Sequence, residues 1–234
     1  MAKLRCYALI DRVRLSTEPW RAAAPNLQGD TRACTSRAAA RRRERHPVGH
    51  DRAMAGSAGL VLVTGISASG KSSVCAELRR RGYDAHDSDD DNNAVWVDRT
   101  TGEVIRRIDG PARTPGYLDR YEWRFDPERV AALAGRAEDR PVFLCGATAN
   151  EAEVWPHFRL SIYLAIDGET LRHRLATRAS NDFGRSDYER DMVLGWHQVA
   201  EDDYRRFGAV VVDGTRPLSE VVDAVLSIAI TAMG

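Results

Sequence analysis

The sequence has few cysteines and no long hydrophobic run. Its four cysteines, Cys6, Cys34, Cys75 and Cys145, are far apart and form no C-x-x-C pair. This spacing excludes the common structural zinc and thioredoxin-like motifs, and scattered thiols predict a cytoplasmic protein. The longest apolar runs, residues 60–63 and 224–230, are too short or too interrupted to span a bilayer, so we expect no membrane partner.

The chain also lacks a net charge, but its charges are unevenly distributed. Residues 1–53 contain 12 Lys and Arg against five Asp and Glu, which leaves 22 against 29 in the rest. The body is therefore acidic, with a formal charge of 22 − 29 = −7. Because a nucleic-acid track needs a continuous basic face, this charge argues against nucleic acid and favours a small-molecule substrate.

Residues 1–55 are rich in Arg and Ala and lack apolar periodicity. We interpret them as a disordered extension. Three explanations stay open: a misassigned start with translation from Met54, an organellar targeting segment, or a basic tail that touches an acidic partner.

Residues 56–234 alternate short β-branched runs with helical stretches, which predicts one three-layer α/β/α domain with a five-stranded, mainly parallel sheet. A turn or hairpin is expected at Thr100–Gly102. The strands are expected at Leu60–Thr64, Tyr83–His86, Pro141–Cys145, Leu160–Ile166 and Ala209–Val212. The helices are expected at Lys71–Arg81, from Asp126 onward, and at Asn150–Phe158, Gly168–Arg178, Asp187–Phe207 and Pro217–Ala229.

A phosphate-binding loop is predicted directly after the first strand. Residues Gly65 to Ser72 read G-x-x-x-x-G-K-S and open the first helix, where backbone N–H groups and the helix N-terminus can surround phosphates. Lys71 would meet the β and γ phosphates of ATP, and Ser72 would ligate Mg²⁺. The alternative is an ordinary Gly/Ser turn. The expected nucleotide-binding residues are Gly65, Ser67, Ala68, Ser69, Gly70, Lys71, Ser72 and Ser73.

With this loop, the Asp87-Ser88-Asp89 triplet and the five-strand layout, residues 57–234 resemble the small P-loop kinases, which include shikimate, gluconate, nucleoside and nucleoside-monophosphate kinases. The triplet is most similar to shikimate kinases. The resemblance implies that Asp89 receives or orients the acceptor's hydroxyl proton and that Asp87 assists Mg²⁺. The alternative is a solvated acidic turn over residues 87–91.

The resemblance also implies a lid at about residues 178–190, whose arginines close on the transferred phosphoryl group. Arg178 and Arg185 are the candidates, and both are alternatively surface residues paired with acids. Arg216, after the fifth strand, lies where these kinases hold the adenine ring. The strand at Pro141–Cys145 ends without an acid, which favours a small kinase using Asp87 over a motor or switch ATPase.

The stretch from about residue 87 to 137 occupies the position of the family's acceptor-binding segment. We assign acceptor contacts to Asp87, Asp89, Arg113, Arg124 and Gly146. The aromatic residues of this stretch either stack on an acceptor ring or bury the segment against the sheet. The shikimate-kinase glycine run is reduced to Gly146, and the monophosphate-kinase arginine is absent near Trp196. These departures leave the acceptor's identity open.

The sequence thus predicts a kinase that moves the γ-phosphoryl group of ATP, with Mg²⁺, to a metabolite, nucleoside or nucleotide. Two alternatives stay open. One is a regulatory protein that binds ATP without turnover, and the other is a polynucleotide end kinase that uses the Arg-rich N-terminus.

Overall fold

A computed structural model gives the structure of this protein and describes residues 59–89, 91–105, 108, 113–178 and 182–234. The extension expected over residues 1–55 lies outside these residues. So do residues 90, 106–107 and 109–112 of the predicted acceptor segment and residues 179–181 of the predicted lid.

A five-stranded parallel sheet forms the centre of the fold, with the strand order β2-β6-β1-β7-β8. Every residue of the central strand β1 is buried, as expected for an apolar strand covered on both faces. The predicted five-stranded parallel sheet is therefore confirmed. The strands are β1 (Leu60–Thr64), β2 (Asp84–Asp87), β6 (Val142–Cys145), β7 (Phe158–Ala165) and β8 (Val210–Asp213).

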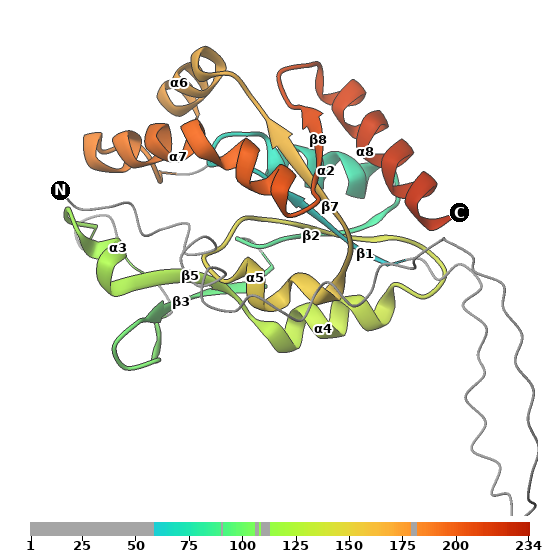
Figure 1. Cartoon of the computed structure of the whole chain (residues 1–234), viewed down its shortest axis with the longest axis horizontal. Helices are drawn as coiled ribbons and strands as arrows, with labels where there is room; N and C mark the ends of the chain where they lie inside the picture. The colour runs from blue at the N-terminus through green and yellow to red at the C-terminus, as the bar shows by residue number, and fades with distance from the viewer. Residues whose placement is uncertain (1–58, 90, 106–107, 109–112, 179–181) are drawn as a thin grey trace, which may run out of the picture.

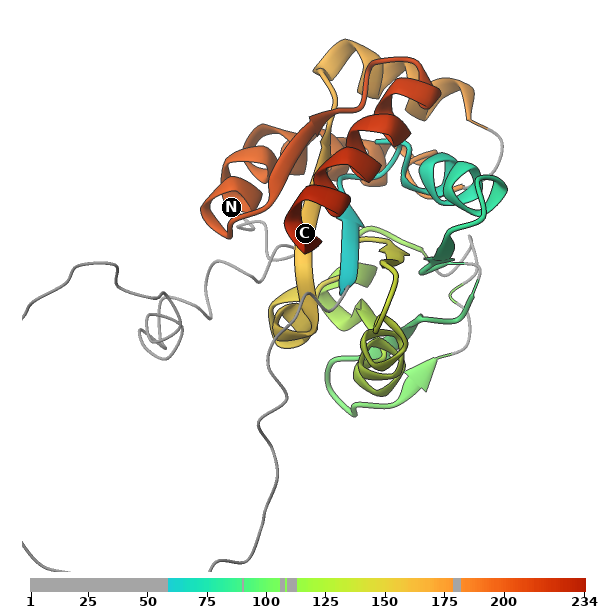
Figure 2. The ribbon, with the colours of Figure 1, turned by 90° about the vertical axis from the view of Figure 1, so that its right-hand side faces the viewer.

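Helices cover both faces of this sheet and complete three layers (Figures 1 and 2). Alternate residues of β1 point to opposite faces: Val61 and Val63 pack with α2 and α8, whereas Leu60 and Leu62 pack with α4. On the second face, Tyr163 of β7 stacks on Tyr204 of α7 with ring centroids 4.7 Å apart. The helices are α2 (Lys71–Arg80), α4 (Pro127–Arg136), α5 (Glu151–Val154), α6 (Gly168–Thr177), α7 (Asp187–Arg206) and α8 (Leu218–Met233).

A second, three-stranded antiparallel sheet lies between β2 and β6 in the chain, with the order β4-β3-β5. It comprises β3 (Ala94–Asp98), β4 (Val104–Ile105) and β5 (Tyr121–Phe125), with the short helix α3 (Tyr117–Arg120) before β5. Its two ends meet, because Asp126 N donates to Asn93 O at 2.9 Å. The hairpin predicted at Thr100–Gly102 is confirmed, and Gly102 has a φ of 74° there. β5 and α3 were not predicted.

One predicted helix differs in kind from the observed structure. The expected helix at Asn150–Phe158 is α5 followed by the 3₁₀ helix η3 (Trp155–His157), and β7 begins at Phe158. Pro156 has no N–H for an α-helical hydrogen bond, so the α-helix cannot continue through it. Within the described residues, no helix is long and apolar enough to cross a membrane.

Candidate active site

The loop from Gly65 to Ser72 forms a concave cradle between β1 and the N-terminus of α2. Gly65 and Gly70 have φ values of 152° and 107°, which glycine adopts without strain. A Cβ atom at Gly65 would lie 2.6 Å from Ser69 Oγ and 3.0 Å from Leu164 O. Only glycine fits there, so the backbone closes tightly enough to direct its N–H groups inward.

Lys71 folds its side chain back over this loop. Its Nζ donates to Gly65 O at 2.7 Å and to Ile66 O at 2.8 Å. Burial lowers the pKa of Lys71, while the negative charges of Asp89, Asp87 and Glu151 oppose that shift. The loop therefore carries an ammonium group that two neutral carbonyls and nearby carboxylates hold in place.

Two buried polar groups at the loop fit an anionic ligand. Ser69 Oγ is buried with no hydrogen-bond partner among the described residues. Arg178 Nη1 donates to Ser67 Oγ at 3.0 Å, while its Nε and Nη2 are buried and have no such partner. Burial lowers the pKa of Arg178, and Glu189 opposes this. Because buried donors are normally satisfied, these groups match the oxygens of a phosphate chain.

Arg174 of α6 supports the loop from behind, a role that the sequence did not indicate. Its Nη1 donates to Ser69 O at 3.1 Å and to Ala68 O at 3.5 Å, and its Nη2 donates to Gly214 O at 2.9 Å. One planar guanidinium thus ties the phosphate loop to the turn after β8. Only the position of Arg174 one helical turn before Arg178 could have suggested this.

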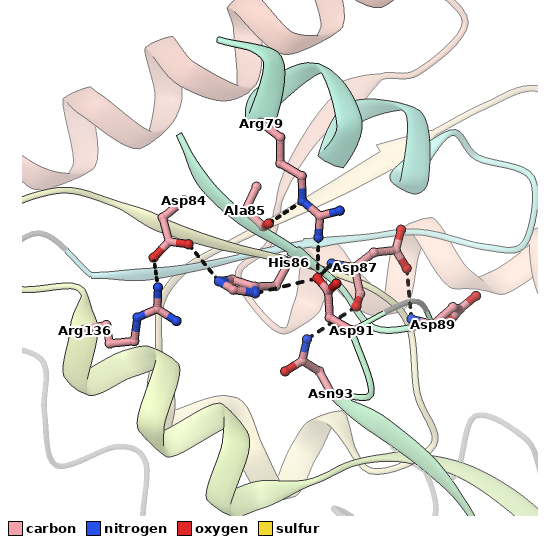
Figure 3. Close-up of polar contacts among 9 residues, drawn as sticks. All are labelled: Arg79, Asp84, Ala85, His86, Asp87, Asp89, Asp91, Asn93 and Arg136. Atoms are coloured by element: carbon pink, nitrogen blue, oxygen red, sulfur yellow. Dashed lines mark hydrogen bonds and ion pairs between the residues drawn. The ribbon is translucent and has the colours of Figure 1, made fainter. Parts of the chain in front are cut away.

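The Asp87-Ser88-Asp89 triplet begins at Asp87, the last residue of β2. Figure 3 shows Asp87 and Asp89 at this end of the strand. Asp87 and Ser88 are 4% and 1% exposed, so a solvated turn does not describe these two residues. Asp87 Oδ1 accepts from Asp89 N at 2.9 Å, and Ser88 Oγ donates to Asp89 Oδ1 at 2.9 Å. Asp89 itself is exposed and lines a cavity with Lys71.

A cluster of charged side chains holds the end of β2 in place (Figure 3). Asp91 Oδ2 accepts from Asp87 N at 2.9 Å and from Arg79 of α2. Asp84 lies between His86 Nε2, 2.8 Å away, and Arg136 of α4, 2.7 Å away. β2 is therefore tied to α4 through Asp84 at its start and to α2 through Asp91 after its end.

A cavity of about 300 Å³ opens beside the phosphate loop. Ser67 and Lys71 of the loop line it together with Asp89 and Arg113, so four of the residues predicted for binding or catalysis meet there. Its other described walls come mainly from aromatic and small side chains. The arrangement places a cation, a carboxylate and an apolar space side by side.

Three predicted acceptor residues, Asp87, Arg124 and Gly146, are not among the residues that line this cavity. Arg124 forms ion pairs with Glu122, at 2.5 Å, and with Glu153. A Cβ atom at Gly146 would lie 2.5 Å from Ser88 Cβ and 3.2 Å from Phe125, so Gly146 makes room for the triplet. The assignment of Arg124 and Gly146 to acceptor contacts stays a prediction.

The described part of the predicted lid, Arg178 and residues 182–190, connects to the second sheet's helix. Glu189 Oε2 accepts from Gly184 N at 2.8 Å, and its Oε1 accepts from Tyr117 Oη of α3 at 3.0 Å. Asp182 accepts from Arg113 at 2.8 Å. Arg178 therefore points to the phosphate loop, whereas Arg185 is exposed.

The remaining predicted residues are a magnesium pair and an adenine contact. Ser72 is exposed on the first turn of α2, and Asp87 is buried at the end of β2. No group of three or more Asp, Glu, His or Cys arranged for a metal exists among the described residues. Mg²⁺ with these oxygen donors fits only when phosphates complete its ligands. Arg216 is exposed and pairs with Glu220 at 2.5 Å.

Glu151 is a buried acid near the loop that the sequence analysis missed. Its Oε1 accepts from Thr64 Oγ1 at 3.2 Å and Thr148 N at 3.0 Å, and its Oε2 accepts from Tyr204 Oη at 2.8 Å. Burial raises the pKa of Glu151 to about 7, and these hydrogen bonds and Lys71 oppose the rise. An acid six residues beyond an apolar strand was the only signal in the sequence.

Comparisons with known proteins identify the fold. No family model matches the sequence, and a search of curated proteins gives no match. A shikimate kinase from Acinetobacter baumannii, solved with shikimate, has a TM-score of 0.52 at 15% identity, covering 75% of this chain and 95% of that chain. A gluconokinase from Sinorhizobium meliloti 1021 has a TM-score of 0.44 at 21% identity, covering 76% and 94%. The chain has the fold of the small P-loop kinases, as the sequence resemblance predicted.

Proposed function

We propose that this chain, which has the fold of a shikimate kinase, transfers the γ-phosphoryl group of ATP to a hydroxyl group of a small-molecule acceptor. The observation that supports this most is the shared cavity wall of Lys71 and Asp89 beside the glycine cradle. Phosphoryl transfer needs positioning and charge stabilisation more than covalent catalysis, and this site offers both.

In the proposed reaction, the acceptor oxygen forms a bond to the γ-phosphorus while the bond to the β,γ-bridging oxygen breaks. ADP leaves with that electron pair, and the hydroxyl proton passes to Asp89. Lys71 and Arg178 stabilise the charge on the phosphoryl oxygens, because cations in a site that excludes water interact strongly. Ser72 and Asp87 would hold Mg²⁺, which neutralises phosphate charge when bound.

The segment assignments follow from this proposal. Residues from about 87 to 137 supply the acceptor side, and residues from about 178 to 190 act as the lid. Residues 56–234 form the catalytic domain. The cytoplasmic location and the adenine contact at Arg216 stay predictions.

The test is Mg²⁺-dependent release of ADP from ATP by the full chain, measured with a panel of hydroxyl acceptors. One acceptor class should stimulate ADP release, and Asp89→Asn should abolish the stimulation while ATP binding is unchanged. Asp119→Asn, an exposed carboxylate on α3, is the matched control. Tight ATP binding with no stimulated turnover by any acceptor would instead indicate a nucleotide-binding regulator.

A further inference from the structure

The cavity beside the phosphate loop has aromatic walls from two separate parts of the fold. Trp96 and Trp123 face each other across β3 and β5, with ring centroids 5.4 Å apart. Phe183, before α7, stacks on Trp196 of α7 at 6.2 Å and 10° between ring planes. All four rings line the cavity, and Trp96, Trp123 and Phe183 keep part of their surface exposed. A flat ligand could therefore contact aromatic faces from both sources.

The charged residues of the wall already have counter-charges. Arg113 donates to Asp182 at 2.8 Å and lies 3.8 Å from the buried Glu189. Glu122 pairs with Arg99 at 3.1 Å and with Arg124 at 2.5 Å. Lys71 and Asp89 belong to the transfer chemistry itself. Among the described wall residues, no cation outside the phosphate loop is thus available for an anionic acceptor without breaking an ion pair.

The volume and polarity of the cavity limit the acceptor further. About 300 Å³ is at the small end of the range for ligand sites. More than half of the described wall residues are apolar. A polyhydroxylated sugar would bury several hydroxyl groups against such walls without partners, and each such group weakens binding. A single hydroxyl can instead meet Asp89, which lines the cavity.

We propose that the acceptor is an uncharged molecule with a planar ring and one reactive hydroxyl group, held by the aromatic pairs Trp96–Trp123 and Phe183–Trp196. This inference rests on the kinase function proposed above and names its substrate class. Deoxynucleosides and aryl alcohols share this chemistry, because each has a flat ring and few hydroxyl groups. The ring lies between the aromatic walls, and the hydroxyl faces Asp89.

The test combines calorimetric titration of the full chain, in the presence of Mg²⁺ and a non-hydrolysable ATP analogue, with acceptor-stimulated ADP release. The neutral ring alcohols are thymidine and 2-phenylethanol, which separate the nucleoside from the aryl source. The comparison compounds are thymidine monophosphate, shikimate, gluconate and glucose. At least one neutral ring alcohol should bind about 10-fold more tightly than every comparison compound.

Variants then test the aromatic walls. Trp123→Leu should weaken binding of the preferred ring alcohol about 10-fold, and Trp123→Phe should restore most of the affinity, because stacking needs a ring face. Trp155→Leu is the matched control, since Trp155 packs on Phe207 outside the cavity walls. It should leave acceptor affinity unchanged.

The outcomes separate the two proposals. Tight binding of a ring alcohol without ADP release would support the substrate class and overturn the kinase function. ADP release stimulated by shikimate, gluconate, glucose or thymidine monophosphate, with no ring alcohol binding more tightly, would support the kinase and overturn the substrate class. Absence of ring-alcohol binding would overturn the substrate class in every case.

Discussion

At the scale of single residues, Arg178 and Glu151 are ionisable side chains in partly or fully buried positions. Burial disfavours the charged form of each, and the neighbouring groups offset only part of this cost. Arg178 has two buried nitrogens without hydrogen-bond partners, and Glu151 has a raised pKa. Such groups cost stability in the empty protein. They persist in functional sites because the same groups interact with charge that arrives with a ligand.

We expect Arg178→Met to lower acceptor-stimulated phosphoryl transfer at least 100-fold, because the transferring phosphoryl group loses a planar donor. The thermal midpoint of the empty protein should stay the same or rise, since an uncompensated buried charge is removed. Initial rates and thermal melts measure the two effects. Arg172→Met, which changes an exposed arginine of α6, is the control, and a large loss of stability in Arg178→Met would contradict the expectation.

Glu151 predicts a pH dependence of stability. Its carboxyl group keeps its proton in the folded protein up to a pKa of about 7, against 4.5 when unfolded. The resulting stabilisation is fully present below pH 4.5 and is lost once the pH has risen through about 7. The full difference is roughly 3 kcal/mol. Denaturant unfolding from pH 4.5 to 8 should show this decline.

Glu151→Gln should remove the decline and leave the protein at least as stable as the natural chain at pH 8. Its carbonyl oxygen can accept from Thr64 and Thr148, and its NH₂ group can donate to Tyr204 Oη, without a charge. Glu153→Gln, on the exposed side of the same short helix, should keep the natural slope. An unchanged slope in Glu151→Gln would show that another group titrates.

At the scale of elements, the phosphate loop depends on α6 as well as on its own glycines. Arg174 reaches the carbonyl groups of Ala68, Ser69 and Gly214. We expect Arg174→Ala to weaken ATP binding about 10-fold, because the loop loses its fixed position. This effect would be indirect, since Arg174 contacts the loop from behind. Calorimetric titration with ATP measures this, and Arg172→Ala is the control. Unchanged affinity would mean that the loop glycines alone fix its shape.

The contact between Gly146, directly after β6, and the Asp87-Ser88-Asp89 triplet is another link between elements. Gly146→Ala would place a Cβ atom 2.5 Å from Ser88 Cβ and displace the triplet. We expect turnover to fall about 10-fold or more while ATP affinity changes little, since the phosphate loop is untouched. Gly135→Ala, where a Cβ atom meets nothing within 4 Å, should be neutral. Equal loss of ATP binding and turnover would point to general unfolding.

The strands and helices around the phosphate loop were predictable from sequence because each is marked by a local pattern. β1 is an uninterrupted apolar run, and α4 begins at Asp126-Pro127, where Asp126 caps the helix by accepting from Glu128 N. β5 was missed although Tyr121–Phe125 alternates aromatic and charged residues, the period-two pattern of a half-buried strand, because the segment was assigned to acceptor binding instead. Arg174 and Glu151 could not be found, since their partners are distant in the chain and no spacing encodes them.

At the scale of the whole molecule, nucleotide binding should stabilise the fold. A saturating ligand that binds only the folded state adds about 2.7 kcal/mol at 100 times its dissociation constant. We expect Mg²⁺ with ATP to raise the thermal midpoint of the full chain by several degrees. Lys71→Ala should show little or no such rise. An equal rise in this variant would mean that ATP binds elsewhere.

The second sheet leaves the main fold and returns to it at nearly the same point, because Asn93 and Asp126 are hydrogen-bonded to each other. Substitutions in the strands between Asn93 and Asp126 therefore change the walls of the cavity, while the strands of the parallel sheet keep their register. On the proposed function, natural selection could change the acceptor, generation by generation, without rebuilding the residues that would bind the phosphates. A lineage that diverged in this way would keep its shape long after its sequence ceased to resemble that of its relatives.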